Sequence, residues 1–344
     1  MSPAELYIVR ALARIADGND LSKEDSRAVL AEVMRGEASP AQIGAFLMGM
    51  RMKGETSAEL AGAAEAMRAV ASHVTTTRSP LLDTCGTGGD GSGTYNISTA
   101  VALVAAGAGV AVAKHGNRSV SSKSGSADVL ERLGLRLDLD AGQMGRCLDE
   151  VGIAFLFAPV LHGAMKHAIG PRREMRLRTL FNLLGPLTNP AGATRQLLGV
   201  YDRSRARQVA EVLAMLGTEH AWVVHGLEGL DELSVVGPSV VFEVRGGDVE
   251  EQEVDPRALG IPLVSAEELG GGSPEENAAW MRRLLEGEDV GGSRHMVALN
   301  AAAAFVVAGR ARGLPEGREL AEETLKSGAA ADLLARLVEA AKTL

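Results

Sequence analysis

A glycine-rich segment near residue 90 constrains the fold of this chain more than any other feature. The apolar residues from Leu81 to Thr84 have the length of a buried strand, and a helix-forming segment rich in Ala and Val begins at about Ser98. Between them lie glycines at positions 86, 88, 89, 91 and 93. Glycine permits positive φ angles and close approach of the backbone to a ligand. The order strand, glycine loop, helix therefore predicts an anion cradle of backbone N–H groups at the positive end of a helix dipole.

The alternative for this loop is a flexible surface turn, but its polar edge favours phosphate binding. Asp90, Asn96, Ser98 and Thr99 stand beside the glycines, and a disordered turn has no need of them. The loop matches the dinucleotide fingerprint poorly and lacks the Lys of the GxxxxGK[ST] phosphate loop. We expect it to hold substrate phosphates in another type of site.

From about residue 80, short apolar runs alternate with loops and helices. Helices are expected at residues 127–133 and 204–216, among others. Such alternation predicts an α/β domain with a mainly parallel sheet. The expected strands are Leu81–Thr84, Val110–Ala113, Ile153–Phe157, Trp222–His225 and Leu233–Val236.

The first part of the chain shows helical signals only. Leu6, Val9, Leu12 and Ile15 recur at helical spacing, and Ser39 followed by Pro40 is a typical helix start. The basic segment from about 160 to 185 is also predicted to be helical. We therefore expect a small helical domain over residues 1–75, completed by about 160–185, and a larger α/β domain over residues 76–159 and 186–344.

Charge and composition exclude several classes of protein. The net charge of the 344-residue chain is -9, which disfavours nucleic acid as the main partner. Two cysteines, Cys85 and Cys147, provide neither a disulfide framework nor metal-ligand spacing. The N-terminus does not resemble a signal peptide, and no apolar run is long enough to cross a membrane. These features predict a cytoplasmic protein without a membrane partner.

A second polar loop follows the strand expected at 110–113. Lys114, His115 and Asn117 lead into a serine-rich stretch that ends near Asp128. Ligands bind at the carboxyl ends of parallel strands, so this loop and the glycine loop can face one ligand. The lysine and the serine hydroxyls suit phosphate and ribose oxygens, and Asn117 can contact an organic substrate.

An acidic pair, Asp231 and Glu232, follows another expected strand. On its own the pair would be an ordinary acidic turn, but a phosphate loop elsewhere in the chain favours a magnesium site, to which Ser98 could add a hydroxyl. Arg172 is suited to bind a substrate carboxylate. Spacing alone does not distinguish it from its basic neighbours, such as Arg173.

Together these motifs carry a resemblance to a known family. They are DTCGTGGD from Asp83, NIST from Asn96, KHGNRSVSSKSGSAD from Lys114, FNLLGPLTNP from Phe181, and the pair Asp231–Glu232. In this order and at this spacing, over nearly the whole chain, they resemble anthranilate phosphoribosyltransferase. That family joins anthranilate to phosphoribosyl diphosphate and releases diphosphate in tryptophan synthesis. The resemblance implies a magnesium-dependent homodimer that associates through its helical domain.

The resemblance also implies a role for each matching residue. None acts as an acid or base, and Lys114, Asp231 and Glu232 stabilise charge. Magnesium is bound by Ser98, Asp231 and Glu232. Anthranilate is bound by Gly86, Asn117 and Arg172, with His115 and His162 along its route. Phosphoribosyl diphosphate is bound by Gly86, Gly89, Asp90, Thr94, Asn96, Ile97, Ser98, Thr99, Lys114, Ser122 and Ser126.

Two alternatives remain at this point. A pyrimidine nucleoside phosphorylase shares the fold and a Lys-His-Gly-Asn-Arg loop, but it would lack the Asp-Glu metal pair and would use free phosphate. A non-enzymatic relative that binds nucleic acid would need a basic surface groove, and the acidic composition argues against one.

Overall fold

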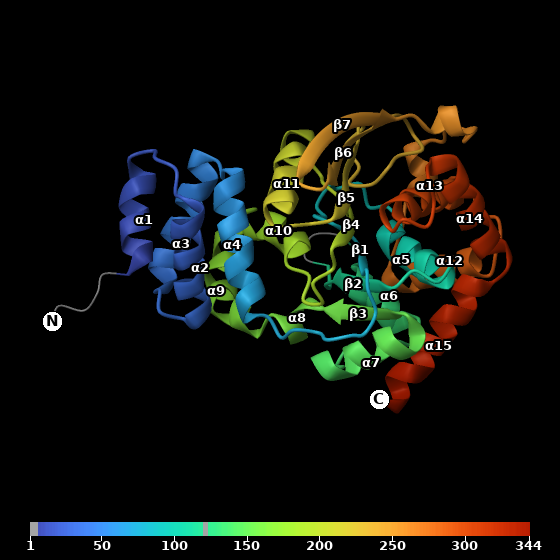
Figure 1. Cartoon of the computed structure of the whole chain (residues 1–344), viewed down its shortest axis with the longest axis horizontal. Helices are drawn as coiled ribbons and strands as arrows, with labels where there is room; N and C mark the ends of the chain where they lie inside the picture. Colours follow the sequence, from blue (N-terminus) through green and yellow to red (C-terminus); the bar gives the residue numbers. More distant parts are fainter. Residues whose placement is uncertain (1–5, 120–122) are drawn as a thin grey trace.

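The computed structural model of the chain describes residues 6–119 and 123–344. Within these residues, seven strands form one sheet in the order β3-β2-β1-β4-β5-β6-β7 (Figure 1). Strands β1 to β5 are parallel, and β6 and β7 extend one edge as antiparallel strands. The strands are β1 (Leu82–Gly86), β2 (Val112–Gly116), β3 (Ile153–Phe157), β4 (Arg195–Gly199), β5 (His220–Gly226), β6 (Ser239–Arg245) and β7 (Asp248–Val254).

Four consecutive helices precede the sheet. The expected start of α3 is confirmed, because the Ser39 hydroxyl accepts from the Gln42 N–H and Pro40 is the first helical residue. Gly54 ends the same helix with a φ of 86°. The helices are α1 (Tyr7–Ala16), α2 (Lys23–Arg35), α3 (Pro40–Lys53) and α4 (Ser57–Val70).

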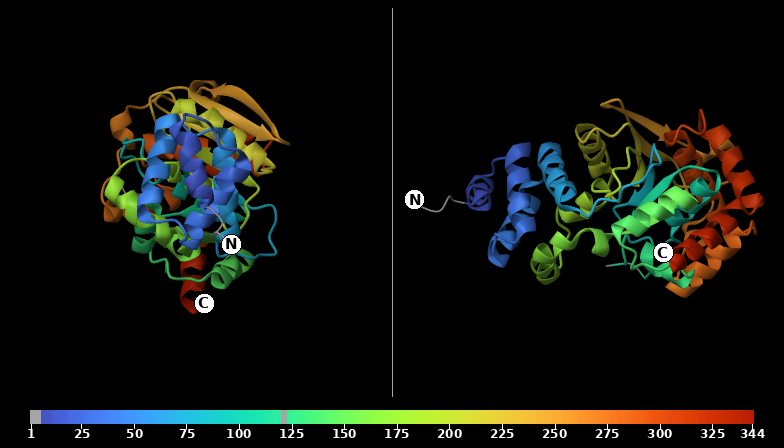
Figure 2. Two further views of the ribbon diagram at one scale, coloured as in Figure 1. Left: turned by 90° about the vertical axis from the view of Figure 1, so that its left-hand side faces the viewer. Right: turned by 60° about the horizontal axis from the view of Figure 1, so that its bottom comes forward.

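The chain returns to these helices after β3. Helices α8 (Ala158–Leu161), α9 (Lys166–Met175) and α10 (Phe181–Leu184) follow that strand, and α9 packs against α2 and α3. Figure 1 and the right-hand view of Figure 2 both show α1–α4 at one end of the molecule and the C-terminal helices at the other.

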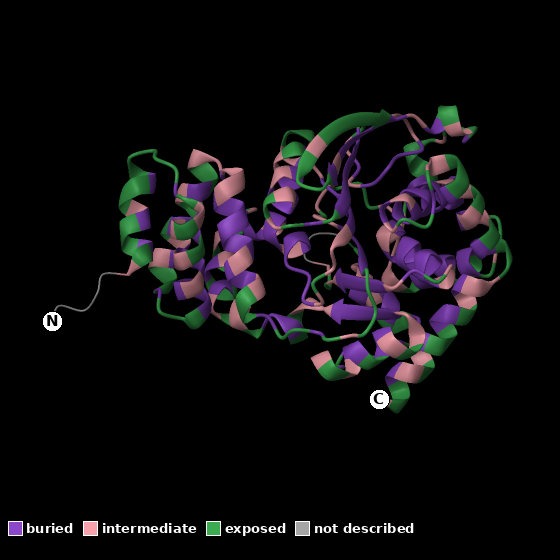
Figure 3. Cartoon of the chain, in the orientation of Figure 1, coloured by how far each residue is buried: buried purple, intermediate pink, exposed green. Residues whose placement is uncertain are grey.

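The remaining helices cover the sheet, and apolar cores form on both of its faces. On one face, α5 and α13 are almost wholly buried (Figure 3), and they pack against Leu82, Leu197 and Val224 of the strands. On the other face, α11 packs against the strands and against α4, so that a single apolar core extends from the sheet into the N-terminal helices. These helices are α5 (Ile97–Gly107), α6 (Ser126–Arg132), α7 (Ala141–Val151), α11 (Arg203–Met215), α12 (Pro274–Leu285), α13 (Gly292–Val307), α14 (Leu314–Lys326) and α15 (Ala329–Thr343).

The fold class expected from the sequence is confirmed, but one strand was predicted wrongly. Residues Leu233–Val236 are largely buried but form no strand, and they do not join the sheet. Asn300 of α13 takes the place of a neighbouring strand, because its side chain donates to the Leu233 C=O (2.8 Å) and accepts from the Leu233 N–H (2.9 Å). The sequence analysis also did not predict β4, β6 or β7. None of the helices in the described residues combines the length and apolarity needed to cross a bilayer.

Candidate functional site

Three loops leave the sheet at the same edge, because they follow the parallel strands β1, β2 and β5. They are the glycine loop (residues 87–96), the serine loop (residues 117–125) and the acidic loop (residues 227–232). The Gly88 N–H donates to Asp231 Oδ2 at 2.9 Å, which joins the first loop to the third. The Asn96 amide donates to the Ser124 C=O at 3.3 Å, which joins the first to the second.

Glycine is required at two kinds of position in the first loop. Gly88 and Gly89 have φ angles of 63° and 76°, which other residues rarely adopt. Gly86 has ordinary φ but no room, since an added Cβ would lie 2.6 Å from Asp231 Oδ2. Helix α5 begins directly after the loop, and the Ser98 N–H in its first turn faces the Glu232 carboxylate. The predicted anion cradle therefore lies against the acidic pair.

Lys114 is the cation of this cluster, and it is only 3% exposed. Its ammonium group donates to the Thr84 C=O at 2.6 Å and lies 3.4 Å from Ser98 Oγ. Burial lowers the pKa of Lys114, while the negative charge of the nearby Asp83 acts in the opposite direction. A positive charge at this position can stabilise negative charge that develops on a leaving group.

The acidic pair is held in an unfavourable environment in the absence of a cation. Burial and the neighbouring charge of Asp90 raise the pKa of Asp231. Burial and the charge of Asp231 raise the pKa of Glu232, and Lys114 only partly opposes this. Buried like charges of this kind favour a bound cation.

The donors present fit a magnesium ion. Magnesium prefers oxygen ligands and usually takes one or two carboxylates, with water and substrate phosphates completing the set. Asp231 and Glu232 supply the carboxylates, and the Ser98 hydroxyl lies beside Lys114 in the same cluster. The described residues contain no group of three or more His, Cys, Asp and Glu side chains that could hold a metal. Most ligands of a magnesium ion here would therefore come from substrate and water.

The other residues predicted for phosphate binding lie around the same loops. Asp90 accepts from the Ser92 hydroxyl at 2.6 Å, and Ser126 donates to the Asn117 C=O at 3.2 Å. Thr94 lies in the glycine loop. Two predicted residues, Ile97 and Thr99, are each 1% exposed. Ile97 belongs to the apolar core, whereas Thr99 Oγ1 is buried without a hydrogen-bond partner in the described residues. Ser122 lies outside the described residues.

The residues predicted to bind the aromatic substrate are positioned by separate contacts. His115 and His162 lie Nε2 to Nε2 at 3.2 Å, and burial lowers their pKa values to about 3 and about 4. Both rings are therefore neutral at physiological pH, and one donates to the other. Arg172 lies 4.9 Å above the Phe181 ring, and its guanidinium has no ion-pair partner in the described part of the chain. Asn117 is exposed at the start of the serine loop.

Comparison with known proteins places this chain in a family. The glycosyl transferase family, a/b domain, matches residues 78–331, and the helical bundle domain of that family matches residues 9–71. The chain is 53% identical over 332 residues to the anthranilate phosphoribosyltransferase of Pelotomaculum thermopropionicum, which covers 96% of each chain. The chain belongs to the anthranilate phosphoribosyltransferase family.

Solved structures agree with this assignment. The anthranilate phosphoribosyltransferase of Thermus thermophilus superposes with a TM-score of 0.92 at 46% identity, covering 96% of this chain and 99% of that one. The enzyme of Saccharomyces cerevisiae, in complex with PRPP and Mg, superposes with a TM-score of 0.91 at 25% identity, covering 99% of both chains. These findings do not favour a nucleoside phosphorylase or a nucleic-acid-binding relative.

The structure of this anthranilate phosphoribosyltransferase family member also shows residues at the site that the sequence analysis did not select. The Arg178 guanidinium donates to the Gly89 C=O and lies 4.1 Å from the centre of the Tyr201 ring. The backbone N–H of Tyr201 in turn donates to Thr87 Oγ1. In the sequence, Arg178 was only one of several arginines in the basic segment from about 160 to 185. Asn300, which holds Leu233 just after the acidic pair, had no signal in the sequence.

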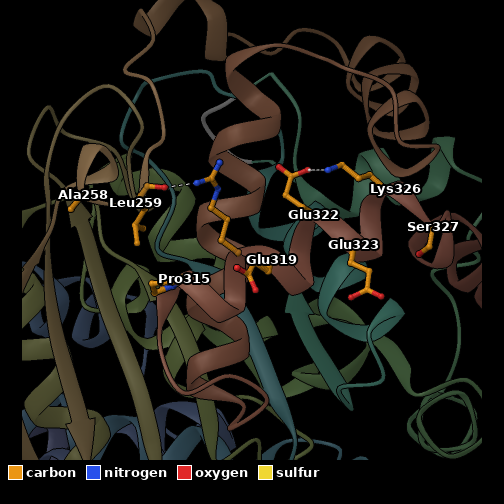
Figure 4. A pocket seen from close by; sticks show the side chains of 9 residues that line it. Ala258, Leu259, Pro315, Glu319, Glu322, Glu323, Lys326 and Ser327 are labelled. Carbon is orange, nitrogen blue, oxygen red and sulfur yellow. Dashed lines mark hydrogen bonds and ion pairs between the residues drawn. The ribbon is translucent and has the colours of Figure 1, made fainter.

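An open surface pocket of about 860 Å³ lies away from these loops, between residues 256–259 and α14 (Figure 4). Three of its charged side chains have partners, since Lys326 and Glu322 face each other at 4.0 Å and Arg318 donates to the Leu259 C=O. None of its lining residues belongs to the glycine, serine or acidic loop. Size alone therefore does not make it the site of the family's reaction.

Proposed function

We propose that this chain transfers the phosphoribosyl group of 5-phosphoribosyl 1-diphosphate to the amine of anthranilate, as a step of tryptophan biosynthesis. The observation that carries the proposal is the convergence of the glycine loop, the buried Lys114 and the acidic pair, of which Glu232 is buried and Asp231 half-buried, at one edge of the sheet. The names of relatives that are half identical over nearly the whole chain support the same reaction.

The proposed site residues follow from this geometry and from the motifs. Magnesium is assigned to Asp231, Glu232 and Ser98, and when bound it neutralises charge on the diphosphate. Anthranilate is assigned to Arg172, Asn117 and Gly86, with His115 and His162 along its route. Phosphoribosyl diphosphate is assigned to Gly86, the glycine loop, the first turn of α5, Lys114, Ser122 and Ser126.

The proposed mechanism depends on positioning and charge stabilisation. Lys114 and the backbone N–H groups of the glycine loop stabilise negative charge as the bond between the ribose anomeric carbon and the diphosphate oxygen breaks. Arg172 holds the anthranilate carboxylate so that the amine nitrogen forms the new bond from the opposite face. The ammonium proton that results leaves to solvent, since the neutral His115 and His162 are assigned no acid or base role.

We also propose a homodimer, two domains and a cytoplasmic location. Met48 and Met52 lie one turn apart on α3 as exposed apolar side chains, Met52 at 76%, and this supports association through the helical domain. The packing of α9 on α2 and α3 supports completion of that domain by residues 160–185. Both cysteines are free and buried, which suits a reducing compartment.

The proposed reaction is tested by the fall in anthranilate fluorescence when the purified chain meets phosphoribosyl diphosphate and magnesium. We expect a loss of signal that requires all three components and that EDTA prevents. An unchanged signal with folded protein would reject the reaction, and phosphorolysis of thymidine or uridine would then be measured.

Replacement of Arg172 by Lys is expected to weaken anthranilate binding selectively. The planar guanidinium can bind a carboxylate through two parallel hydrogen bonds, and Lys cannot reproduce this geometry. Loss of one charge-assisted hydrogen bond costs roughly 1.5–3 kcal/mol, so the KM for anthranilate should rise roughly 10- to 100-fold. The KM for phosphoribosyl diphosphate should not change. Arg173→Lys, at the exposed neighbouring position, is the matched control, and an equal effect in both variants would reject the assignment.

A further inference from the structure

Strands β1 and β2 separate at the edge of the sheet where the site lies. The other parallel pairs, β1 with β4, β2 with β3 and β4 with β5, are each paired over five residues. In contrast, β1 and β2 pair only at Leu82 and Val112. Continuing that register would place Thr84 opposite Lys114. The His115 N–H would then donate to the Thr84 C=O, and the Ala113 C=O would accept from an N–H group of β1.

Side chains satisfy these backbone groups instead. The His115 N–H donates to Asp83 Oδ1 at 3.0 Å, and the Ala113 C=O accepts from Asn189 Nδ2 at 2.8 Å. The Thr84 C=O accepts from the Lys114 ammonium group at 2.6 Å. The two inserted side chains also bind each other, because Asn189 Nδ2 donates to Asp83 Oδ2 at 2.8 Å.

The inserted pair is buried and rigidly held. Asp83 has no exposed surface and Asn189 is 6% exposed. Asn189 Oδ1 also accepts from the Ala191 N–H at 2.9 Å, so the whole amide group is fixed. A buried carboxylate is costly unless it replaces interactions that the fold needs. Asn189 belongs to the motif FNLLGPLTNP, for which the proposed mechanism provides no role.

We propose that Asp83 and Asn189 are positioning residues that act as a polar wedge between β1 and β2. The wedge keeps the strands apart where they enter the glycine and serine loops. The Lys114 side chain can then extend between them to Thr84 and Ser98, with its ammonium group beside the acidic pair. The role in catalysis rests on the proposed function, whereas the separation of the strands does not.

The wedge is tested with Asn189→Ala and Asp83→Asn in the full chain. Asn189→Ala removes all three hydrogen bonds of the amide group, to Asp83, the Ala113 C=O and the Ala191 N–H. Asp83→Asn keeps the volume but places an NH₂ group against Asn189. Thr188→Val is the matched control, since Thr188 is buried in the same motif and, within the described residues, its hydroxyl donates to the Gly185 C=O (3.0 Å) and not to β2. Hydrogen exchange of the His115 amide and steady-state kinetics are measured well below the unfolding temperature of each variant.

We expect exchange at the His115 amide to accelerate at least about tenfold in both wedge variants and not in Thr188→Val. The KM for phosphoribosyl diphosphate should rise, or kcat should fall, by about tenfold or more, because displacement of a substrate-contacting group by 1 Å can have effects of this size. Unchanged exchange in the wedge variants would overturn the inference, whatever the kinetics. If Asn189→Ala does not fold, Asp83→Asn decides. If the wild type transfers no phosphoribosyl group, the proposed function fails while the exchange result still decides the wedge.

Discussion

Replacing Asp231 with Asn and Glu232 with Gln is expected to abolish turnover while leaving the chain folded and more stable. The two substitutions keep the side-chain volumes and remove the charges that would hold magnesium. Stabilisation of a leaving group by a metal contributes several kcal/mol, so kcat should fall by about a thousandfold or more. Magnesium with phosphoribosyl diphosphate should raise the melting temperature of the wild type and have little effect on the variant.

The expected gain in stability follows from the directions of the two pKa shifts. The pKa of each carboxyl is raised in the folded chain by burial and by neighbouring negative charge. At neutral pH, ionisation of these groups therefore costs more in the folded than in the unfolded chain, and it opposes folding. The amide variant removes that cost, and its melting temperature without metal should exceed that of the wild type.

Glu228→Gln is the matched control for this variant. Glu228 lies in the same acidic loop, but its carboxylate binds the Ser234 hydroxyl and not the cluster around Lys114. Its turnover should be retained. Normal turnover of the Asp231→Asn, Glu232→Gln variant at saturating magnesium would reject the metal assignment, and a lower melting temperature without metal would reject the electrostatic argument.

Features that depend on a short stretch of sequence were predicted well. The glycine loop, the start of α5 and the strand before each loop are local patterns, and the resemblance of the combined motifs is now confirmed by the relatives. The parallel sheet was also predictable, because strands and helices alternate. The assigned roles of individual residues remain predictions.

Features that depend on contacts between distant residues were not predictable. Leu233–Val236 has the composition of a strand, but the backbone of Leu233 binds the side chain of Asn300, which is 67 positions away in the sequence. The wedge joins residues 83 and 189, which are 106 positions apart. Arg178 reaches the glycine loop across 89 positions. No local pattern indicates which polar side chain will replace a missing strand partner.

Lys114→Met is expected to lose both turnover and stability, in contrast to the variant of the acidic pair. Met has a similar length and no charge, so it leaves Asp83 and Glu232 buried without their cation. Removing one member of a buried charge cluster typically costs about 3–5 kcal/mol of folding free energy. Turnover should fall by about a hundredfold or more, because a preorganised donor to the leaving group is lost.

Combining the variants tests whether Lys114 acts through this charge cluster. In the Asp231→Asn, Glu232→Gln background, Lys114→Met should lower the free energy of unfolding by less than it does in the wild type, because fewer buried negative charges remain unpaired. Such coupling between neighbouring groups is typically about 0.5–3 kcal/mol. This difference is measured by urea unfolding of four proteins. They are the wild type, Lys114→Met, the Asp231→Asn, Glu232→Gln variant, and the variant that combines all three substitutions. Lys166→Met, at an exposed position on α9, controls for the loss of a lysine. Equal costs in the two backgrounds would show that Lys114 stabilises the fold through packing and its bond to Thr84, and not through the acidic pair.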